Sequence, residues 1–152
     1  MPLDDSSKGM FLFKDGSSYD TISFSVLKDI KLKSFCILSS PEKCIVEVEY
    51  RIFVNSSLEC FKNKRFFSLG ARSKPLEIPL PKDLNISKNS NVNIKLWIAR
   101  ELDTKSEIEM FIQSFDDVMT NMEQDGVFKI KPLRYSNSTN YINLTKIDYE
   151  LL

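Results

Sequence analysis

One stretch of the sequence, residues 44–54, restricts the possible folds more than any other. Apolar and charged side chains alternate along it, with Val46, Val48, Tyr50, Ile52 and Val54 separated by Glu47, Glu49 and Arg51. Successive side chains of a β-strand point to opposite faces of the sheet. The alternation therefore predicts a strand with one face in a core and the other in water.

Further strands are predicted on the same grounds at 19–27, 30–38 and 92–98. A polar turn, Ser-Ser-Pro-Glu, comes after residue 38 and precedes the strand at 44–54. This order predicts that the strands at 30–38 and 44–54 form a hairpin.

Prolines occupy positions 75, 79 and 81. Because proline has no amide hydrogen for a ladder, residues 75–81 are predicted to be an edge strand or an extended connection. Residues 82–91 are rich in Asn, Lys and Ser, and they are predicted to form a mobile loop.

The spacing of apolar residues changes after Thr104. Ile108, Phe111, Ile112, Phe115, Val118, Met119 and Met122 follow the i, i+3, i+4 rule of an amphipathic helix. Ser106 with Glu109, or Thr104 with Glu107, would form a capping box, and Gly126 suits a left-handed residue at the helix end. Two further β-type runs come next, at 127–135 and 141–152.

Together these patterns predict a mainly β (α+β) fold: an antiparallel β sandwich or partly open barrel, with one amphipathic helix at about 105–125 between the early strands and two C-terminal strands. A length of 152 residues is that of one domain. We expect residues 1–10 to be a flexible arm and 11–152 to be a single globular domain.

The composition argues against catalysis. The chain has no histidine, only four glycines, and no CxxC, GxSxG or phosphate-loop motif. We therefore expect no catalytic residue, no metal, no cofactor and no small-molecule substrate. Cys36, Cys44 and Cys60 match no metal spacing and are expected to be reduced, although lysines beside Cys60 leave open a thiol of lowered pKa.

The sequence predicts an intracellular, soluble protein of the cytoplasm or nucleus. It has no apolar run of about 20 residues, and its first residues are polar and acidic, unlike a secretory signal. Four Asn-x-Ser/Thr sequons, at Asn55, Asn85, Asn137 and Asn143, argue weakly for the opposite compartment.

Charge is unevenly distributed in a chain whose formal net charge is zero. Residues 60–75 carry five bases and no acid, whereas residues 101–125 carry eight acids and the single base Lys105. A second basic stretch, Lys129, Lys131 and Arg134, comes after them. The sequence therefore predicts a molecule with basic and acidic surfaces on different sides.

Three interpretations of the basic stretch at 60–75 remain open. Its phenylalanines, Phe61, Phe66 and Phe67, could belong to the core, with the cations only keeping an edge soluble. Alternatively, cations beside aromatic rings suit an anionic partner such as nucleic acid or a membrane surface. The third interpretation is self-association, in which the basic stretch of one copy meets the acidic helix of the next.

We expect a non-catalytic interaction or assembly module that binds a protein partner or its own copies. The residues predicted to bind are Lys62, Lys64, Arg65, Phe66, Phe67, Arg72, Lys74, Trp97, Glu109, Asp116 and Asp117. The alternatives are a peripheral matrix or coat protein on an anionic membrane or nucleic acid, and an oligonucleotide-binding barrel for single strands. Zero net charge and the late position of the helix disfavour the barrel.

Overall fold

The computed structural model describes residues 10–13, 20–71, 73–100, 108–131 and 141–152. Two antiparallel sheets dominate it, one of five strands in the order β10-β2-β7-β4-β5 and one of three in the order β12-β3-β6. Two short pairs, β1 with β8 and β9 with β11, accompany them. The elements are β1 Met10–Phe13, β2 Asp20–Val26, β3 Ile30–Ile37, β4 Lys43–Val54, β5 Ser57–Leu69, β6 Leu76–Ile86, β7 Asn91–Arg100, β8 Ile108–Phe111, β9 Gln113–Ser114, α2 Phe115–Glu123, β10 Phe128–Ile130, β11 Tyr141–Ile142 and β12 Leu144–Leu151.

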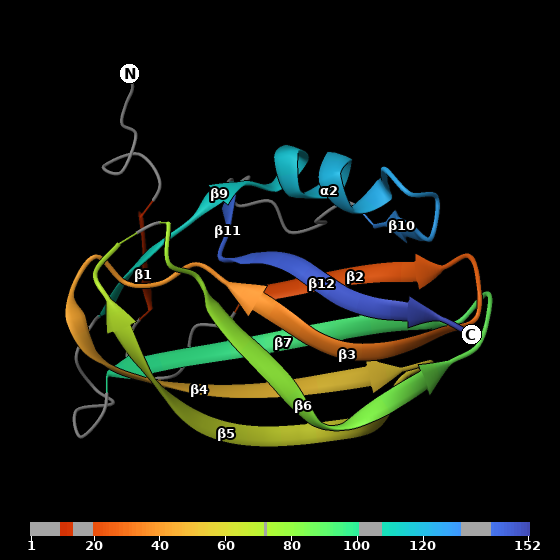
Figure 1. Cartoon of the computed structure of the whole chain (residues 1–152), viewed down its shortest axis with the longest axis horizontal. Helices are drawn as coiled ribbons and strands as arrows, with labels where there is room; N and C mark the ends of the chain where they lie inside the picture. The colour runs from red at the N-terminus through yellow and green to blue at the C-terminus, as the bar shows by residue number, and fades with distance from the viewer. Residues whose placement is uncertain (1–9, 14–19, 72, 101–107, 132–140) are drawn as a thin grey trace.

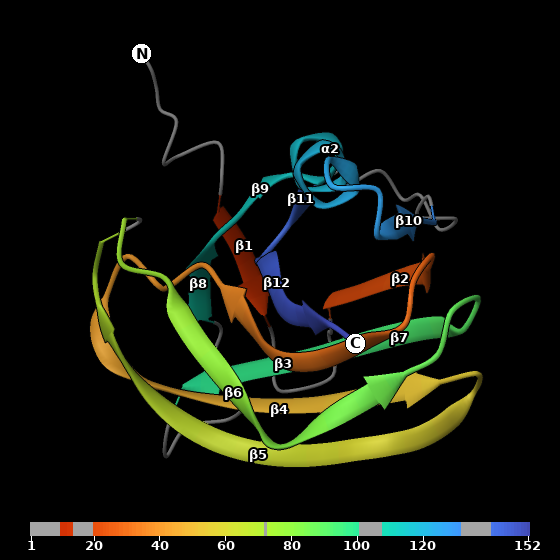
Figure 2. The same cartoon turned by 45° about the vertical axis from the view of Figure 1, so that its right-hand side comes forward.

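The two sheets pack face to face, which confirms the predicted β sandwich and excludes the closed barrel. Figures 1 and 2 show β12, β3 and β6 lying over one face of the five-stranded sheet. Helix α2 packs against β10 and β12 at one side of the sandwich, and β5 forms the opposite edge.

The core follows from the predicted alternation. Every second residue of β4, from Val46 to Ile52, is buried, and the residues between them are only half-buried. Tyr50 of β4 and Phe35 of β3 meet edge to face across the two sheets, with ring centroids 5.2 Å apart. Phe128 of β10 makes the same kind of contact with Tyr149 of β12, at 5.0 Å. Such aromatic pairs join the sheets at two places along the core.

The predicted hairpin between residues 30–38 and 44–54 is wrong. Strand β3 pairs with β6 and β12, whereas β4 pairs with β5 and β7, so the chain changes sheets between β3 and β4. Ser39 and Ser40 in this crossover are fully buried. Ser68 donates its hydroxyl to the Ser40 carbonyl and accepts the Ser40 amide, so serine hydroxyls satisfy backbone groups that a polar exposed turn would give to water.

The predicted helix exists but is shorter than expected. It begins at Phe115, with Ser114 as N-cap, and residues 108–111 instead form β8, which pairs with β1. Met110, Phe111 and Ile112 are buried in succession, a pattern that the helical period does not distinguish from a strand covered on both faces. Because Glu109 lies in β8, the Ser106–Glu109 capping box is wrong, and Thr104 and Glu107 lie outside the described residues.

Gly126 is confirmed as a left-handed residue just beyond the helix, with φ of 72° and an amide bonded to the Glu123 carbonyl. The proline-rich segment is confirmed as an edge strand, β6.

The prediction of a loop at 82–91 is wrong for most of these residues, because β6 continues to Ile86 and β7 starts at Asn91. Of the other expectations, residues 1–9 of the predicted arm lie outside the described residues, and Met10 belongs to β1.

A buried asparagine joins three strand ends to the last strands of the chain. Asn143 is 1% exposed, and its Nδ2 donates to the carbonyls of Leu38 and Phe111 at 2.9 and 2.7 Å. Its backbone amide donates to a carboxylate oxygen of Asp20 at 2.7 Å. Because Nδ2 is buried and doubly bonded, the sequon at Asn143 cannot be glycosylated in the folded chain, whereas Asn55 and Asn85 are exposed.

Replacement of Asn143 by Asp should be strongly destabilising. The substitution removes the Nδ2 donor from two buried carbonyls and sets a carboxylate oxygen against them, so we expect a loss of about 3 kcal/mol in the free energy of unfolding. Urea denaturation measures it, with Asn121→Asp on the exposed surface of α2 as the matched control. Equal midpoints for the two variants would contradict the assigned role.

Asp20 predicts a pH dependence of stability. Burial raises its pKa from 3.8 to about 6, although the amides of Asn143, Leu144 and Thr21 partly oppose the shift. The folded state therefore keeps a proton that the unfolded state loses, and the contribution of this group to stability falls as pH rises from about 4 to about 6. We expect Asp20→Asn, whose amide oxygen still accepts the Asn143 amide, to remove about 2 kcal/mol of this fall. If the unfolding free energies of the wild type and Asp20→Asn change with pH in parallel, the raised pKa of Asp20 is disproved.

Candidate functional site

Residues 60–69 of the basic stretch lie in β5, a strand of 13 residues at the edge of the five-stranded sheet. Its ladder partner is β4, with which it pairs from Val54↔Ser57 to Lys43↔Leu69. The β4–β5 turn holds Asn55 and Ser56 at φ of 51° and 70°, the left-handed pair that a two-residue hairpin loop requires. Among the described strands none pairs with the other edge of β5, and most of its side chains are exposed.

The cations of β5 point to both faces of the sheet. Lys62 and Lys64 pair with Tyr50 and Val48, whose side chains are buried, so both lysines belong to the face that carries the core. Both lysines are nevertheless exposed, although β5 contacts β6, the edge strand of the three-stranded sheet. Arg65 faces the opposite way, directly across from Glu47. Within the described residues no carboxylate forms an ion pair with Lys62 or Lys64.

The outer face of the five-stranded sheet carries a stack of aromatic rings around Arg51. The Arg51 guanidinium carbon lies 4.7 Å from the Phe61 ring centroid and 4.9 Å from that of Trp97. Its Nη2 donates to the Glu49 carboxylate at 3.2 Å. Two cation–π contacts and one ion pair therefore hold the guanidinium in place.

Two hollows lie on this outer face. One, of about 320 Å³, is bordered by Glu49, Arg51, Asn63 and Trp97. The other, of about 600 Å³, lies toward the β4–β5 turn and is lined in part by Asn55, Asn91, Asn93, Lys95 and Lys131. Polar side chains border both hollows, and no sheet formed by the described residues covers this face.

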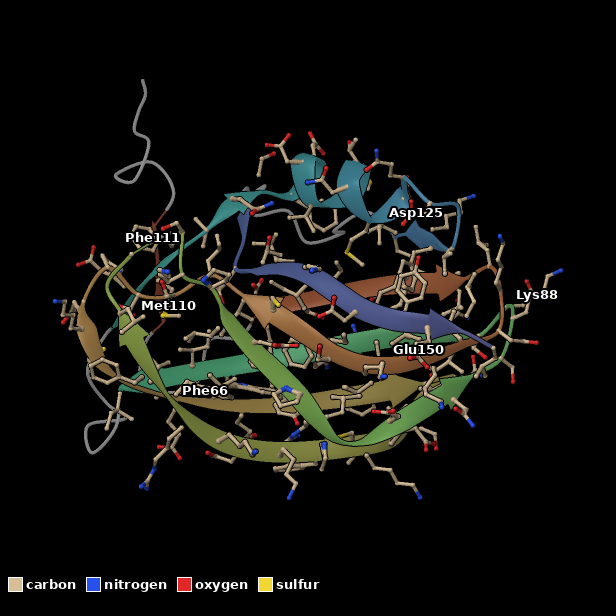
Figure 3. All side chains as sticks on the ribbon, in the orientation of Figure 1. Phe66, Lys88, Met110, Phe111, Asp125 and Glu150 are labelled. Carbon is tan, nitrogen blue, oxygen red and sulfur yellow. The ribbon has the colours of Figure 1, made fainter. Side chains whose placement is uncertain are left out.

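The predicted apolar anchors do not form one surface. Phe66 lies on the inner face and packs against the core, and it is labelled in Figure 3. Phe67, which is 57% exposed, and Trp97 lie on the outer face, where Phe67 pairs with Ile45 and Trp97 with Glu49. Since Phe61 is also exposed, the interpretation of all three phenylalanines as core residues is wrong for Phe61 and Phe67.

The remaining predicted residues fall in several places. Lys74 is exposed in the β5–β6 connection, and Arg72 lies outside the described residues. Glu109 is half-buried in β8, so it is not part of the helix face as predicted. Asp116 and Asp117 are exposed in the first turn of α2.

The basic residues of β5 and the acidic residues of α2 lie on different sides of the molecule. Figures 1 and 2 place α2 and β5 at opposite sides of the sandwich. The side of α2 is nevertheless mixed in sign, because the exposed Lys129 lies in the neighbouring strand β10. The Glu123 carboxylate accepts a hydrogen bond from the Ile130 amide at 2.8 Å. The Asp125 carboxylate, labelled in Figure 3, interacts with the Tyr149 hydroxyl. Asp116 and Asp117 are thus the exposed acids of the helix itself.

Cys60 does not have the environment of a reactive thiol. Burial raises its pKa by more than the Tyr50 hydroxyl and the Lys62 ammonium lower it. The interpretation of a lowered thiol pKa is therefore wrong, and a structural thiol remains. Among the described residues, no cluster of His, Cys, Asp or Glu could hold a metal ion, and no helix is long and apolar enough to cross a bilayer.

Sequence reasoning missed the contact of Arg51 with Phe61 and Trp97 on the sheet surface, and that of Lys95 with Phe53. The alternation at 44–54 did place Arg51 on the water-facing side of its strand, but its neighbours Phe61 and Trp97 are brought beside it only by pairing with β5 and β7. Comparison with known proteins adds no family: no protein-family model and no curated protein matches the sequence.

Replacement of Arg51 by Ala should disturb the aromatic stack. Trp97 is the sole tryptophan, so its fluorescence reports directly on the guanidinium above its ring. We expect a shifted emission maximum and a loss of about 1 kcal/mol in unfolding free energy. Lys43→Ala removes another exposed cation of β4 and serves as the control. Identical emission from the wild type and Arg51→Ala would contradict the stack.

Proposed function

We propose that this chain is a non-catalytic interaction module that binds an extended acidic segment of a partner protein along the free edge of β5. The observation that carries the proposal is the length, exposure and charge of this edge strand together. A strand edge that no described strand covers presents backbone amides and carbonyls, which an extended segment can pair with as an added strand.

Edge strands of this length normally need protection against indiscriminate pairing. In β5 the protection consists of Lys62 and Lys64, two charges on the face that otherwise carries the core. A second copy of β5, paired antiparallel about Asn63, would bring Lys62 of one copy opposite Lys64 of the other. Like charges in direct opposition destabilise a ladder, so the same residues that disfavour self-pairing favour an acidic strand.

Charge alone supplies little affinity, because each exposed ion pair contributes about 0 to 1 kcal/mol. Apolar contacts must add to it, and β5 exposes Leu58, Phe61, Phe67 and Leu69 along its length. The partner segment is therefore expected to alternate acidic residues with apolar ones. Backbone pairing would give general affinity, and the lysines would select for charge.

Selection from a displayed library of random extended peptides tests the proposal. Peptides retained by the protein should be enriched in Asp and Glu alternating with apolar residues. Calorimetry with one selected peptide should show binding that weakens with salt, and Lys62→Gln/Lys64→Gln should weaken it about fivefold or more. Lys82→Gln/Lys88→Gln removes the same charge from exposed positions of β6 and its following turn, and it should bind as the wild type does.

Other outcomes would assign a different partner. If the selected peptides are not enriched in acidic residues, or if both double variants bind the selected peptide equally, the proposal of an acidic partner segment is wrong. Light scattering that shows salt-sensitive oligomers of the wild type would favour self-association instead. Binding of single-stranded oligonucleotides that the Lys62→Gln/Lys64→Gln variant loses would move the proposal to nucleic acid.

A further inference from the structure

The larger hollow on the outer sheet face has a different chemistry from the edge of β5. It has a volume of about 600 Å³, within the range of small-molecule sites. Its walls come from three adjacent strands and the β4–β5 turn, and Phe53 supplies apolar surface. It does not involve the free edge of β5, so a ligand in the hollow and the proposed partner would bind at separate places.

The charge of the hollow is of one sign. Lys95 and Lys131 line it, and no acidic residue is found among the described residues that border it. The Lys95 ammonium lies 5.6 Å from the Phe53 ring centroid, so a cation stands beside the apolar part of the wall. Lys131 is exposed just beyond β10, and its backbone amide donates to the Ser23 carbonyl, which fixes the chain next to β2.

The neutral groups around the hollow are oriented as donors. Ser23 Oγ accepts Asn93 Nδ2 at 2.7 Å, which leaves the Ser23 hydroxyl hydrogen available. Asn91 Oδ1 accepts the Ser25 hydroxyl at 2.9 Å, so the Nδ2 of Asn91 remains to donate. Asn55 Oδ1 accepts the Asn91 amide at 2.9 Å, and Asn55 Nδ2 donates one hydrogen to Ser90 Oγ at 3.4 Å, so its second hydrogen remains to donate.

The donors are held in place by the fold. The backbone amide of Asn55 donates to the Asn91 carbonyl at 2.8 Å while the Asn91 amide donates to Asn55 Oδ1, so the turn and β7 are joined by two bonds. Asn93 spans Thr21 and Ser23 of the neighbouring strand with its Nδ2. The donors therefore need little reorganisation to meet a ligand.

We propose that this hollow binds the phosphate group of a small phosphorylated molecule. Two ammonium groups match the charge of a phosphate monoester, which is about −1.5 to −2 at neutral pH, better than the single charge of a carboxylate. Three neutral donors match its several oxygens. Because the hollow is much larger than a phosphate, the organic part of the molecule lies against Phe53. This departs from the expectation that the chain binds no small molecule.

Titration followed by two-dimensional amide NMR tests the site. Potassium phosphate and then glucose 6-phosphate are added against potassium chloride at equal ionic strength. We expect saturable shifts confined to the amides of Ser23, Asn55, Asn91 and Asn93 and to their neighbours, with tighter binding of glucose 6-phosphate than of free phosphate. Citrate at equal charge should bind more weakly than phosphate, since the proposal names phosphate rather than carboxylate.

A pair of charge-matched variants makes the result decisive. Lys95→Gln/Lys131→Gln should weaken phosphate binding at least about tenfold. Lys62→Gln/Lys64→Gln loses the same charge from β5 and should bind phosphate as the wild type does. The amide spectrum of each variant establishes that it is folded, and if Lys95→Gln/Lys131→Gln is not, the single variant Lys131→Gln on the exposed position replaces it. Shifts shared equally by all lysine-bearing strands, equal affinity in the two variants, or preference for citrate would overturn the phosphate site.

Discussion

The sandwich depends on covering the inner face of a five-stranded sheet with a sheet of only three strands. Burial of the alternate side chains of β2, β7 and β4 against β3 supplies the main driving force, because apolar area removed from water dominates folding energy. In this arrangement β5 contacts β6 of the narrower sheet without pairing with it, and most side chains of β5, its lysines included, stay exposed. At the other side helix α2 packs on β10 and β12. The backbone carbonyls of Leu38 and Phe111, at the ends of β3 and β8, accept hydrogen bonds from the Asn143 side chain instead of from a neighbouring strand.

Local patterns in the sequence predicted the elements whose burial alternates, and they failed where pairing is distant. The strand at 44–54 was found because its inner face is apolar from Val46 to Ile52. The hairpin was wrong because burial of Ser39 and Ser40 depends on residues from β5 and its following loop, which no local pattern reveals. The apolar residues at 108–112 fit the helical period as well as the strand period, and only the pairing of residues 108–111 with β1 distinguishes the two.

Local sequence also predicted only part of the candidate binding surface. The charge excess at 60–75 is visible in the sequence, and the exposure of Lys62 and Lys64 agrees with it. Their separation from Arg65 is not visible until residues 60–69 are known to be a strand, in which neighbours face opposite ways. Arg51, Asn93 and Lys95 act with residues from other strands, so their arrangement required the order of the sheet.

The surroundings of each cation explain why equal charges need not act equally. On the outer face Arg51 is bound to Glu49, and Arg65 lies across from Glu47, so much of that positive charge is balanced within the sheet. Lys62 and Lys64 instead have the apolar positions Tyr50 and Val48 as their partners across the ladder. A cation whose neighbours are apolar gains most from an acid supplied by another molecule, because no internal carboxylate has to be displaced first. The position of the lysines on the inner face, more than their number, is therefore the basis of the selectivity for an acidic strand that we propose for β5.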